Sequence, residues 1–498
     1  MPFHIPYTFG VTLFAAIGTF LFGYDSGIAT TIIAFPSWNT YMSHPSPTLI
    51  GGISSAYSAG EALGVLLQTL IADRLGRIRF LQLLCVITLL GTCVQTASTG
   101  IRMFIAGRAV TGFGVGGMVA TIPLYLSEIA PPRRRGFLAG FTGVGIAVGV
   151  MMSSWVAVAC FYAPQGDVQW RVPIALQIPW TPVLFLGLAT FMPESPRILL
   201  RKGRLAEAER AFERVHRGEG EGETRREFAL MRAQIEYEKG REFVGYLALF
   251  RQYRQRVLVA IAIALMAILS GAPVVGFYQT ILYRALGIQQ KNILILAAAR
   301  GTLSLVAVLL INRFLLDQWG RRQLLLWGMA ISTGILIYCA AMQKIYQDSD
   351  NQVGKGFAVL GIFAHAFFND HLCGTLESVC PIYNAEILPI ALRSKVIGIA
   401  AFIFFSVTVA FTEAAPSAFA NIKQNYYYVF VGCTAVMWVI GYYWFPETTG
   451  RTLEEIAAAF GDRVVDVARE NSETNMVLVE ETKGADVRVN DREAGMAV

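Results

Sequence analysis

The chain has 498 residues, of which 54% are hydrophobic and 15% are charged, and its mean hydropathy is +0.50. A soluble protein carries about 25% charged residues, so this composition excludes an ordinary soluble protein and indicates an integral membrane protein. The net charge of +6 alone would also suit a nucleic-acid-binding protein, so the distribution of the basic residues has to be considered.

Apolar stretches long enough to cross a membrane recur along the chain. A spanning helix needs roughly 20 residues, and we therefore predict an all-α membrane protein with twelve transmembrane helices. They lie near residues 8–34, 50–71, 80–98, 103–127, 136–162, 172–192, 257–285, 292–316, 323–343, 354–384, 395–419 and 426–445.

The seventh stretch contains the sequence AILSGAPVVGFY at residues 267–278. Pro273 removes a backbone donor and Gly271 weakens the preceding turn, so a helix is expected to break here. Within a membrane such a break is tolerated only where neighbours or a cavity satisfy the exposed backbone. The stretch therefore predicts part of the wall of a solute pathway.

The basic residues fix the expected orientation. If both termini are cytoplasmic, the inner segments hold 32 of the 41 Lys and Arg residues, the outer loops hold seven, and Arg108 and Arg300 lie within the membrane. This asymmetry follows the positive-inside rule. The net charge thus reflects topology, and no nucleic-acid partner is expected. The plasma membrane is the expected location of this multi-pass protein.

Several other classes of site find no support in the sequence. The first helix follows too short and too uncharged a segment for a cleaved signal, and all seven cysteines lie in apolar stretches, where they read as buried small residues rather than disulfides. His365 and His371 are six residues apart, on nearly opposite helix faces, so they cannot bind one metal ion together. We expect no metal, no cofactor and no enzymatic activity.

The chain divides into four parts. Residues 1–192 and 257–445 form two six-helix halves, and residues 193–256 form a charged linker in which apolar residues at helical spacing predict cytoplasmic amphipathic helices. Residues 446–498 form a cytoplasmic tail that is expected to be largely disordered after about residue 465.

The two halves repeat the same charged motifs. DRLGR (73–77) recurs as DQWGRR (317–322), and PESPR (193–197) recurs as PETTGR (446–451), while each half also has a Glu seven residues before an Arg. Such residues can join the halves when the inner side is closed, or they can serve only topology and loop solubility. The predicted cytoplasmic gate comprises Asp73, Arg77, Glu128, Arg135, Glu194, Arg197, Asp317, Arg321, Glu386, Arg393, Glu447 and Arg451.

These motifs occur in a longer series that resembles the sugar porter family of the major facilitator superfamily, of the fungal type. The series is FGYDSG (22–27), ADRLGR (72–77), GRAVTGFGVGG (107–117), PLYLSEIAPPRRRG (123–136), WRVPIALQ (170–177), PESPR, DQWGRR, YNAEILPIALRSK (383–395) and PETTGRTLEE (446–455). The resemblance implies two pseudo-symmetric six-helix halves with a solute site between them.

The resemblance also shows where the usual sugar ligands are replaced. Positions that normally carry polar or Trp ligands here hold Gly143, Ile268, Pro273, Ser304, Pro381, Phe404, Phe405 and Thr408. A hexose would leave its hydroxyl groups unpaired in such a site, at roughly 1–3 kcal/mol each. A more apolar, aromatic or acidic solute is therefore expected.

Charged groups inside the membrane are functional candidates. Asp25 and Arg108 match the proton-coupling pair of the family, although a static ion pair is the alternative. Arg300 could attract an anionic solute, with Glu61 or Glu377 as the counter-charge and Phe277 and Tyr278 as aromatic walls. The alternative for these residues is packing and hydrogen bonding within the bundle.

Together these features predict a secondary active transporter that works by alternating access. Proton-coupled uptake of a carbohydrate-like or organic-acid compound is the expected activity. Export of a fungal metabolite and a non-transporting nutrient sensor are the alternatives. The expected partners are a small solute, protons and the lipid bilayer, and a monomer is sufficient for this architecture.

Overall fold

The computed structural model describes residues 7–130, 135–216, 221–239, 253–314, 320–372, 379–388 and 390–448, together with Ile456 and Phe460. Contacts divide the chain into a unit of residues 1–449 and a second unit of residues 450–498. The account below concerns the first unit, whose described residues are almost entirely helical.

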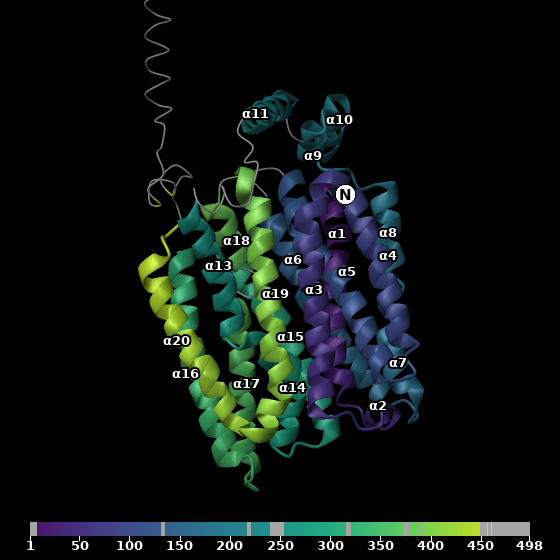
Figure 1. Cartoon of the computed structure of the whole chain (residues 1–498), viewed down its shortest axis with the longest axis vertical. Coiled ribbons are helices and arrows are strands. Elements are labelled where there is room, and N and C mark those ends of the chain that lie inside the picture. The colour runs from purple at the N-terminus through teal and green to yellow at the C-terminus, as the bar shows by residue number, and fades with distance from the viewer. Residues whose placement is uncertain are drawn as a thin grey trace, which may run out of the picture. The chain divides into compact units, whose positions relative to one another are not determined.

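The first half of the chain forms eight helices. They are α1 (Tyr7–Ile32), α2 (Pro36–Tyr41), α3 (Pro47–Leu75), α4 (Arg77–Thr96), α5 (Ile101–Ile129), α6 (Arg135–Phe161), α7 (Asp167–Ala175) and α8 (Trp180–Thr190). The linker contains α9 (Pro196–Arg201), α10 (Leu205–Val215) and α11 (Glu221–Lys239). Figure 1 shows these three helices beyond one end of the bundle.

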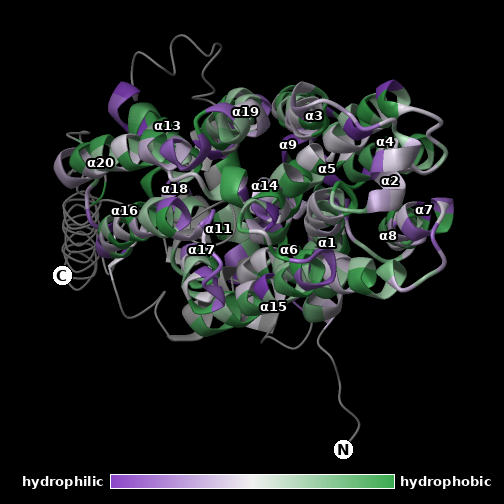
Figure 2. Ribbon diagram, turned by 90° about the horizontal axis from the view of Figure 1, so that it is seen from below, coloured by the Kyte–Doolittle hydropathy of each residue, from purple (hydrophilic) through white to green (hydrophobic). Residues whose placement is uncertain are grey.

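The second half contains α13 (Arg254–Leu269), α14 (Ala272–Ala285), α15 (Gln290–Phe314), α16 (Arg321–Tyr346), α17 (Gln352–Leu372), α18 (Val379–Ile387), α19 (Ile390–Asn421), the 3₁₀ turn η2 (Lys423–Asn425) and α20 (Tyr426–Trp444). Seen along the helices, the labels of the two halves fall into two groups (Figure 2).

Among the described residues, ten helical segments are long and apolar enough to cross a membrane. The other two predicted spans are also helical. The helix α3 has 29 residues, but Glu61, Gln68 and several Ser and Gly residues lower its hydropathy, and the described apolar part of α17 is Gln352–Phe368. Leu90, Leu186, Trp327 and Val436 are 58–60% exposed, as expected for side chains that face lipid.

Two of the twelve spans are interrupted near their middle. The sixth consists of α7 and α8, and α7 contains Pro173 and ends at Ala175, five residues before α8 begins at Trp180. The seventh consists of α13 and α14, separated by Ser270 and Gly271. Proline and glycine therefore interrupt one span in each half, and both interruptions bring buried polar residues into the bundle.

Glycine residues let α3 and α5 pack with their backbones in contact. A Cβ atom at Gly60 would lie 2.1 Å from the carbonyl oxygen of Ala109, and one at Gly64 would lie 2.1 Å from that of Phe113. On α5, a Cβ atom at Gly112 would lie 2.2 Å from the carbonyl oxygen of Tyr57. Small residues at four-residue spacing on both helices thus form one close seam.

The two halves meet along two helix pairs. The helix α3 packs against α19, where a Cβ at Gly51 would lie 2.6 Å from the carbonyl oxygen of Glu413. The helix α6 packs against α15, and Trp155 donates a hydrogen bond to Thr302 over 3.0 Å. These pairs give each half two helices at the boundary with the other half.

The linker helices have a small core of their own. It comprises Leu199, Leu200, Ala208, Phe212, Met231 and Ile235. The expected amphipathic pattern therefore corresponds to helices that bury apolar residues against one another. The limits of the halves, linker and tail stay a prediction.

Candidate functional site

A buried ion pair lies inside the first half. Asp25 of α1 is fully buried and Arg108 of α5 is 1% exposed, and Nη1 of Arg108 lies 2.5 Å from Oδ2 of Asp25. The same nitrogen also donates to the carbonyl oxygen of Asp25 over 3.3 Å. The structure thus brings together the two residues that the sequence pairs as the proton couple.

Two neighbours complete the environment of this pair. Gln177, in the break between α7 and α8, donates from Nε2 to Oδ1 of Asp25 over 3.0 Å. The guanidinium carbon of Arg108 lies 3.8 Å from the centre of the Tyr57 ring, a cation–π contact. Gln177 and Tyr57 are absent from the sequence-based site, although an amide next to the Ile-Pro-Trp break is a signal that could have identified Gln177.

Glu61 belongs to the same cluster. It is 1% exposed, and its electrostatic neighbours are Arg108, Asp25, Ser58 and Tyr57. The sequence analysis considers Glu61 as a counter-charge for Arg300, but the structure gathers it with the ion pair of the first half. We call Asp25, Tyr57, Glu61, Arg108 and Gln177 the proton-site cluster.

The break in the seventh span, between α13 and α14, lies at the predicted position. The residue Gly271 has a φ of 81°, a left-handed conformation that glycine adopts without strain, and Pro273 lies in the first turn of α14. The freed backbone finds partners: the amide of Ala272 donates to Oγ of Ser270 over 3.4 Å, and Nε2 of His365 lies 3.4 Å from the Ser270 carbonyl oxygen. A second irregularity follows at Tyr278, with φ −112° and ψ 15°.

Arg300 lies on α15 close to this broken helix. The side chain is 6% exposed, and its electrostatic neighbours include Tyr283 of α14 and His365 of α17. A Cβ atom at Gly276 would lie 3.8 Å from Nη2 of Arg300, so the guanidinium borders the α14 backbone. Ser304, one turn further along α15, is 8% exposed.

The aromatic candidates lie mainly on α19 and α14. The rings of Phe404 and Phe405 are T-shaped with centroids 5.1 Å apart, and Thr408 donates to the carbonyl oxygen of Phe404 over 2.8 Å. The hydroxyl of Tyr278 donates to the carbonyl oxygen of Thr412 over 2.7 Å. Phe277 is only partly buried.

The remaining cavity candidates are less informative. Gly143 on α6 and Ile268 on α13 are buried, and Pro273 is partly exposed. Glu377 lies outside the described residues, and Pro381 is described only as part of the backbone of α18.

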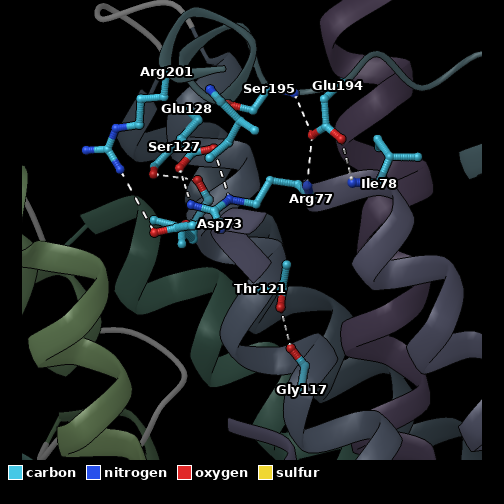
Figure 3. A network of polar contacts seen from close by, with 12 residues as sticks. Asp73, Arg77, Ile78, Gly117, Thr121, Ser127, Glu128, Glu194, Ser195 and Arg201 are labelled. Carbon is cyan, nitrogen blue, oxygen red and sulfur yellow. Dashed lines mark hydrogen bonds and ion pairs between the residues drawn. The ribbon is translucent and has the colours of Figure 1, made fainter. Parts of the chain in front are cut away.

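Charged residues form a dense network at the end of the first half near α9 and α10 (Figure 3). Arg77, 2% exposed, pairs with Asp73 over 2.7 Å and with Glu128 through two nitrogen–oxygen contacts of 2.9 and 3.2 Å. Glu194 accepts hydrogen bonds from the backbone amides of Arg77 and Ile78 over 2.9 and 3.3 Å. We call these residues the Arg77 network.

The second half repeats this arrangement. Arg321 lies 3.4 Å from Glu386, whose other oxygen accepts a hydrogen bond from Thr448 over 2.6 Å. A Cβ atom at Gly320 would lie 2.3 Å from the Glu447 carboxylate, just as one at Gly76 would lie 2.4 Å from Glu194.

The repeat extends to two tyrosines. Tyr125 and Tyr383 each donate a hydrogen bond from the hydroxyl, to the carbonyl oxygens of Pro193 and Pro446 respectively. The pairing of the two sequence motifs is therefore visible in three dimensions, and we call the second set the Arg321 network.

Among the described residues, the contacts of each network join elements of one half, or of that half and the segment that follows it. Arg197 lies half-buried on α9, and Arg393 donates to the carbonyl oxygen of Leu388 over 3.4 Å. Asp317, Arg451 and the Arg135 side chain lie outside the described residues. That these residues join the halves when the inner side is closed stays a prediction.

Three further hydrogen bonds between the halves lie at the opposite end of the bundle from the Arg77 network. Glu413 of α19 accepts a hydrogen bond from Ser55 of α3. Thr280 of α14 donates to the carbonyl oxygen of Thr30 over 3.2 Å, and Arg284 donates to that of Ala34 over 3.2 Å. The sequence analysis misses Glu413, because no repeated motif or family pattern points to it.

No three His, Cys, Asp or Glu side chains come together as a metal-binding group in the part of the chain that the structure describes.

Known proteins resemble this chain over nearly its whole length. The family described as "Sugar (and other) transporter" matches residues 11–460. The MFS-type transporter criB of Aspergillus cristatus is 30% identical over 452 residues, which cover 90% of this chain and 92% of criB. The high-affinity glucose transporter of Kluyveromyces lactis is 26% identical over 498 residues, covering 97% of this chain and 90% of that transporter.

Solved structures give the fold. The proton:xylose symporter XylE of E. coli, bound to 6-bromo-6-deoxy-D-glucose, superimposes with a TM-score of 0.76 at 21% identity, over 91% of this chain and 99% of XylE. The human organic anion transporter MFSD10 superimposes with a TM-score of 0.57 at 14% identity, over 89% of this chain and the whole of that chain.

The predicted fold and the predicted class of function are thereby confirmed. The twelve spans, the repeated charged networks and the match over residues 11–460 agree: the chain belongs to the sugar (and other) transporter family of the major facilitator superfamily and is a secondary transporter of small solutes.

Proposed function

We propose that the protein couples the uptake of a carbohydrate-like or organic-acid solute to an inward flow of protons. The observation that carries the proposal is the fully buried pair of Asp25 and Arg108. A carboxylate beside an arginine stays charged while the pair is closed, and it gains a proton when the pair separates in a dry site. Proton uptake can therefore alternate with the opening and closing of the halves.

The composition of the cavity candidates supports a solute with fewer hydroxyl groups than a hexose. Gly143, Ile268 and Pro273 offer no side-chain hydrogen bond, whereas Arg300 offers a buried positive charge next to the broken α14. An anionic or aromatic compound would use the charge and the Phe404–Phe405 pair without leaving hydroxyl groups unsatisfied.

The relatives support both carbohydrate-like and organic-acid solutes and do not favour one class over the other. They include transporters named for glucose, a symporter named for xylose and, at the level of the fold, a transporter named for organic anions. A hexose is the solute that the replaced ligands argue against, so it serves as the critical comparison.

The proposed arrangement in the cell follows from charge and composition. Both termini and the linker (193–256) lie in the cytoplasm, because 32 of the 41 basic residues then lie on the inner side. The halves are residues 1–192 and 257–445, and the tail is residues 446–498. The protein works as a monomer in the plasma membrane, with the Arg77 and Arg321 networks controlling the inner side.

A solute panel tests the proposal. Wild-type protein in liposomes with an imposed pH gradient is offered hexoses, disaccharides, quinate-like acids and aromatic metabolites, with Asp25→Asn as the matched variant. We expect accumulation of an acid or aromatic compound in wild type and at least a tenfold loss in Asp25→Asn. High-affinity accumulation of a hexose would contradict the argument from the replaced ligands, and accumulation independent of the gradient would contradict proton coupling.

A further inference from the structure

Glu61 lies where an ionised side chain is hardest to stabilise. It is the middle residue of α3, 14 residues from Pro47 and 14 from Leu75, so roughly 21 Å of helix separates it from either end. Its side chain is 1% exposed, and the backbone of Glu61 is pressed against Gly116 of α5.

The charged and titratable groups around Glu61 come from three helices. Tyr57 lies one turn earlier on α3, Arg108 comes from α5, and Asp25 comes from α1. On the other side of α3 lies α19, whose Glu413 contacts Ser55, six residues before Glu61. Glu61 therefore has one described cation within its electrostatic reach, and that cation is already paired.

The partners in the cluster are distributed unevenly. Asp25 receives Arg108 on one oxygen and the Gln177 amide on the other. Glu61 has the hydroxyl groups of Ser58 and Tyr57 as its hydrogen-bonding neighbours, and its buried Oε1 has no partner within hydrogen-bond geometry. Two carboxylates and one guanidinium would leave one uncompensated negative charge in the membrane interior, which is among the most costly arrangements a protein can hold. One bound proton removes that charge.

We propose that Glu61 is a second proton-binding site of the transporter, which holds a proton while Arg108 is paired with Asp25. This inference rests on the proposed role of Asp25 and Arg108 in its second step. A proton that binds Asp25 neutralises that carboxylate and frees Arg108, and Arg108 then pairs with Glu61, which gives up its own proton. One proton enters at Asp25 and one leaves from Glu61, so the cluster is neutral before and after the exchange.

The direct test observes the bound proton and needs no solute. Infrared spectra of the purified full-length protein at neutral pH are compared between wild type and Glu61→Gln, in H₂O and in D₂O. We expect the difference spectrum to contain the isotope-sensitive carbonyl band of a protonated carboxyl group. Complete retention of that band in Glu61→Gln would place the proton elsewhere and overturn the proposal.

A second variant tests whether the two carboxyls share Arg108. In Asp25→Asn the guanidinium loses its partner and is available to Glu61, so the pH at which the Glu61 band is half-formed should fall by about one unit or more. An unchanged midpoint would overturn the exchange of Arg108 between the two carboxyls.

Thermal unfolding shows whether Glu61→Gln removes only the proton-binding group or also destabilises the fold. Glutamine has the shape and charge of protonated glutamate, so Glu61→Gln should unfold within a few degrees of wild type, whereas a charged, Arg108-paired Glu61 would make the same change strongly destabilising. In liposomes Glu61→Gln should lower gradient-driven proton uptake at least tenfold. Because the infrared result does not depend on transport, a solute panel without proton coupling would contradict the proposed function while leaving the bound proton on Glu61 measurable.

Discussion

The two halves carry the same charged networks at one end of the bundle but differ in the membrane interior. The first half gathers Asp25, Glu61 and Arg108 into one cluster, whereas the second half places Arg300 beside Tyr283 and His365 next to a broken helix. The two halves thus share their charged networks but differ in the buried charged residues of the membrane interior. The proposed proton exchange uses the carboxyl groups of the first interior, and the proposed solute site uses the charge and aromatic rings of the second.

The largest change in stability is expected when Arg108, the cation of the Asp25–Glu61 cluster, is removed. Arg108→Gln leaves a buried carboxylate without its partner and should lower the free energy of unfolding by about 3–5 kcal/mol. Adding Asp25→Asn should recover most of this loss, because no buried charge then remains unpaired. Thermal unfolding in detergent measures both steps.

A half-exposed pair provides the control for this measurement. Arg232 lies 3.0 Å from Glu236 with 51% and 62% of the side chains exposed, so Arg232→Gln should cost less than about 1 kcal/mol. A double variant as unstable as the sum of the single changes would show that Asp25 and Arg108 act independently.

The Arg77 and Arg321 networks sharpen the comparison of the two halves. Arg77 makes three ion-pair contacts of 2.7–3.2 Å at 2% exposure, whereas Arg321 approaches Glu386 at 3.4 Å and is 14% exposed. Because Arg77 is the more deeply buried of the two, Arg77→Ala should cost about 3 kcal/mol or more, and Arg321→Ala should cost less. Equal losses of unfolding free energy would mean that the two networks are energetically equivalent despite their geometry.

Arg300→Gln tests the second interior. If Arg300 binds an anionic solute, the half-saturation concentration for that solute should rise about 10- to 100-fold, since a hydrogen bond to a charged group contributes about 1.5–3 kcal/mol. A neutral solute should change less than threefold. Lys344→Gln, which removes an exposed basic residue at the end of α16, is the matched control. An equal rise in the half-saturation concentration for the anionic and the neutral solute would show that Arg300 contributes to helix packing and does not bind the anion.

The smallest effect is expected at the boundary between the halves. Ser55→Ala removes the hydroxyl that donates to Glu413 and should change the free energy of unfolding by about 1 kcal/mol. Because this contact closes one end of the bundle, the variant should also raise the rate at which a cysteine-reactive reagent labels a cysteine placed at Ser54. An unchanged labelling rate would show that the Ser55–Glu413 contact does not control the opening of this end of the bundle.

Much of the fold could be predicted from the sequence, because apolar length and repeated motifs are local properties. The break at Gly271 and Pro273 follows from local sequence and lies where expected, whereas the pairing of Asp25 with Arg108 was expected from the family resemblance and is also present. The neighbours of Glu61 could not be predicted, because helical spacing gives the face of α3 that carries it but not the helix that covers that face. Gln177 and Glu413 depend in the same way on which helices meet.

The close seam of α3 and α5 has a consequence for the moving parts. Backbone contacts at Gly60, Gly64 and Gly112 hold α3 and α5 close together, so we expect Glu61 and Arg108 to move as one unit. Asp25 stands on α1, which packs most extensively against α6. The distance between Arg108 and Asp25 can therefore change when α1 moves. A small displacement of α1 would decide whether the guanidinium pairs with Asp25 or with Glu61.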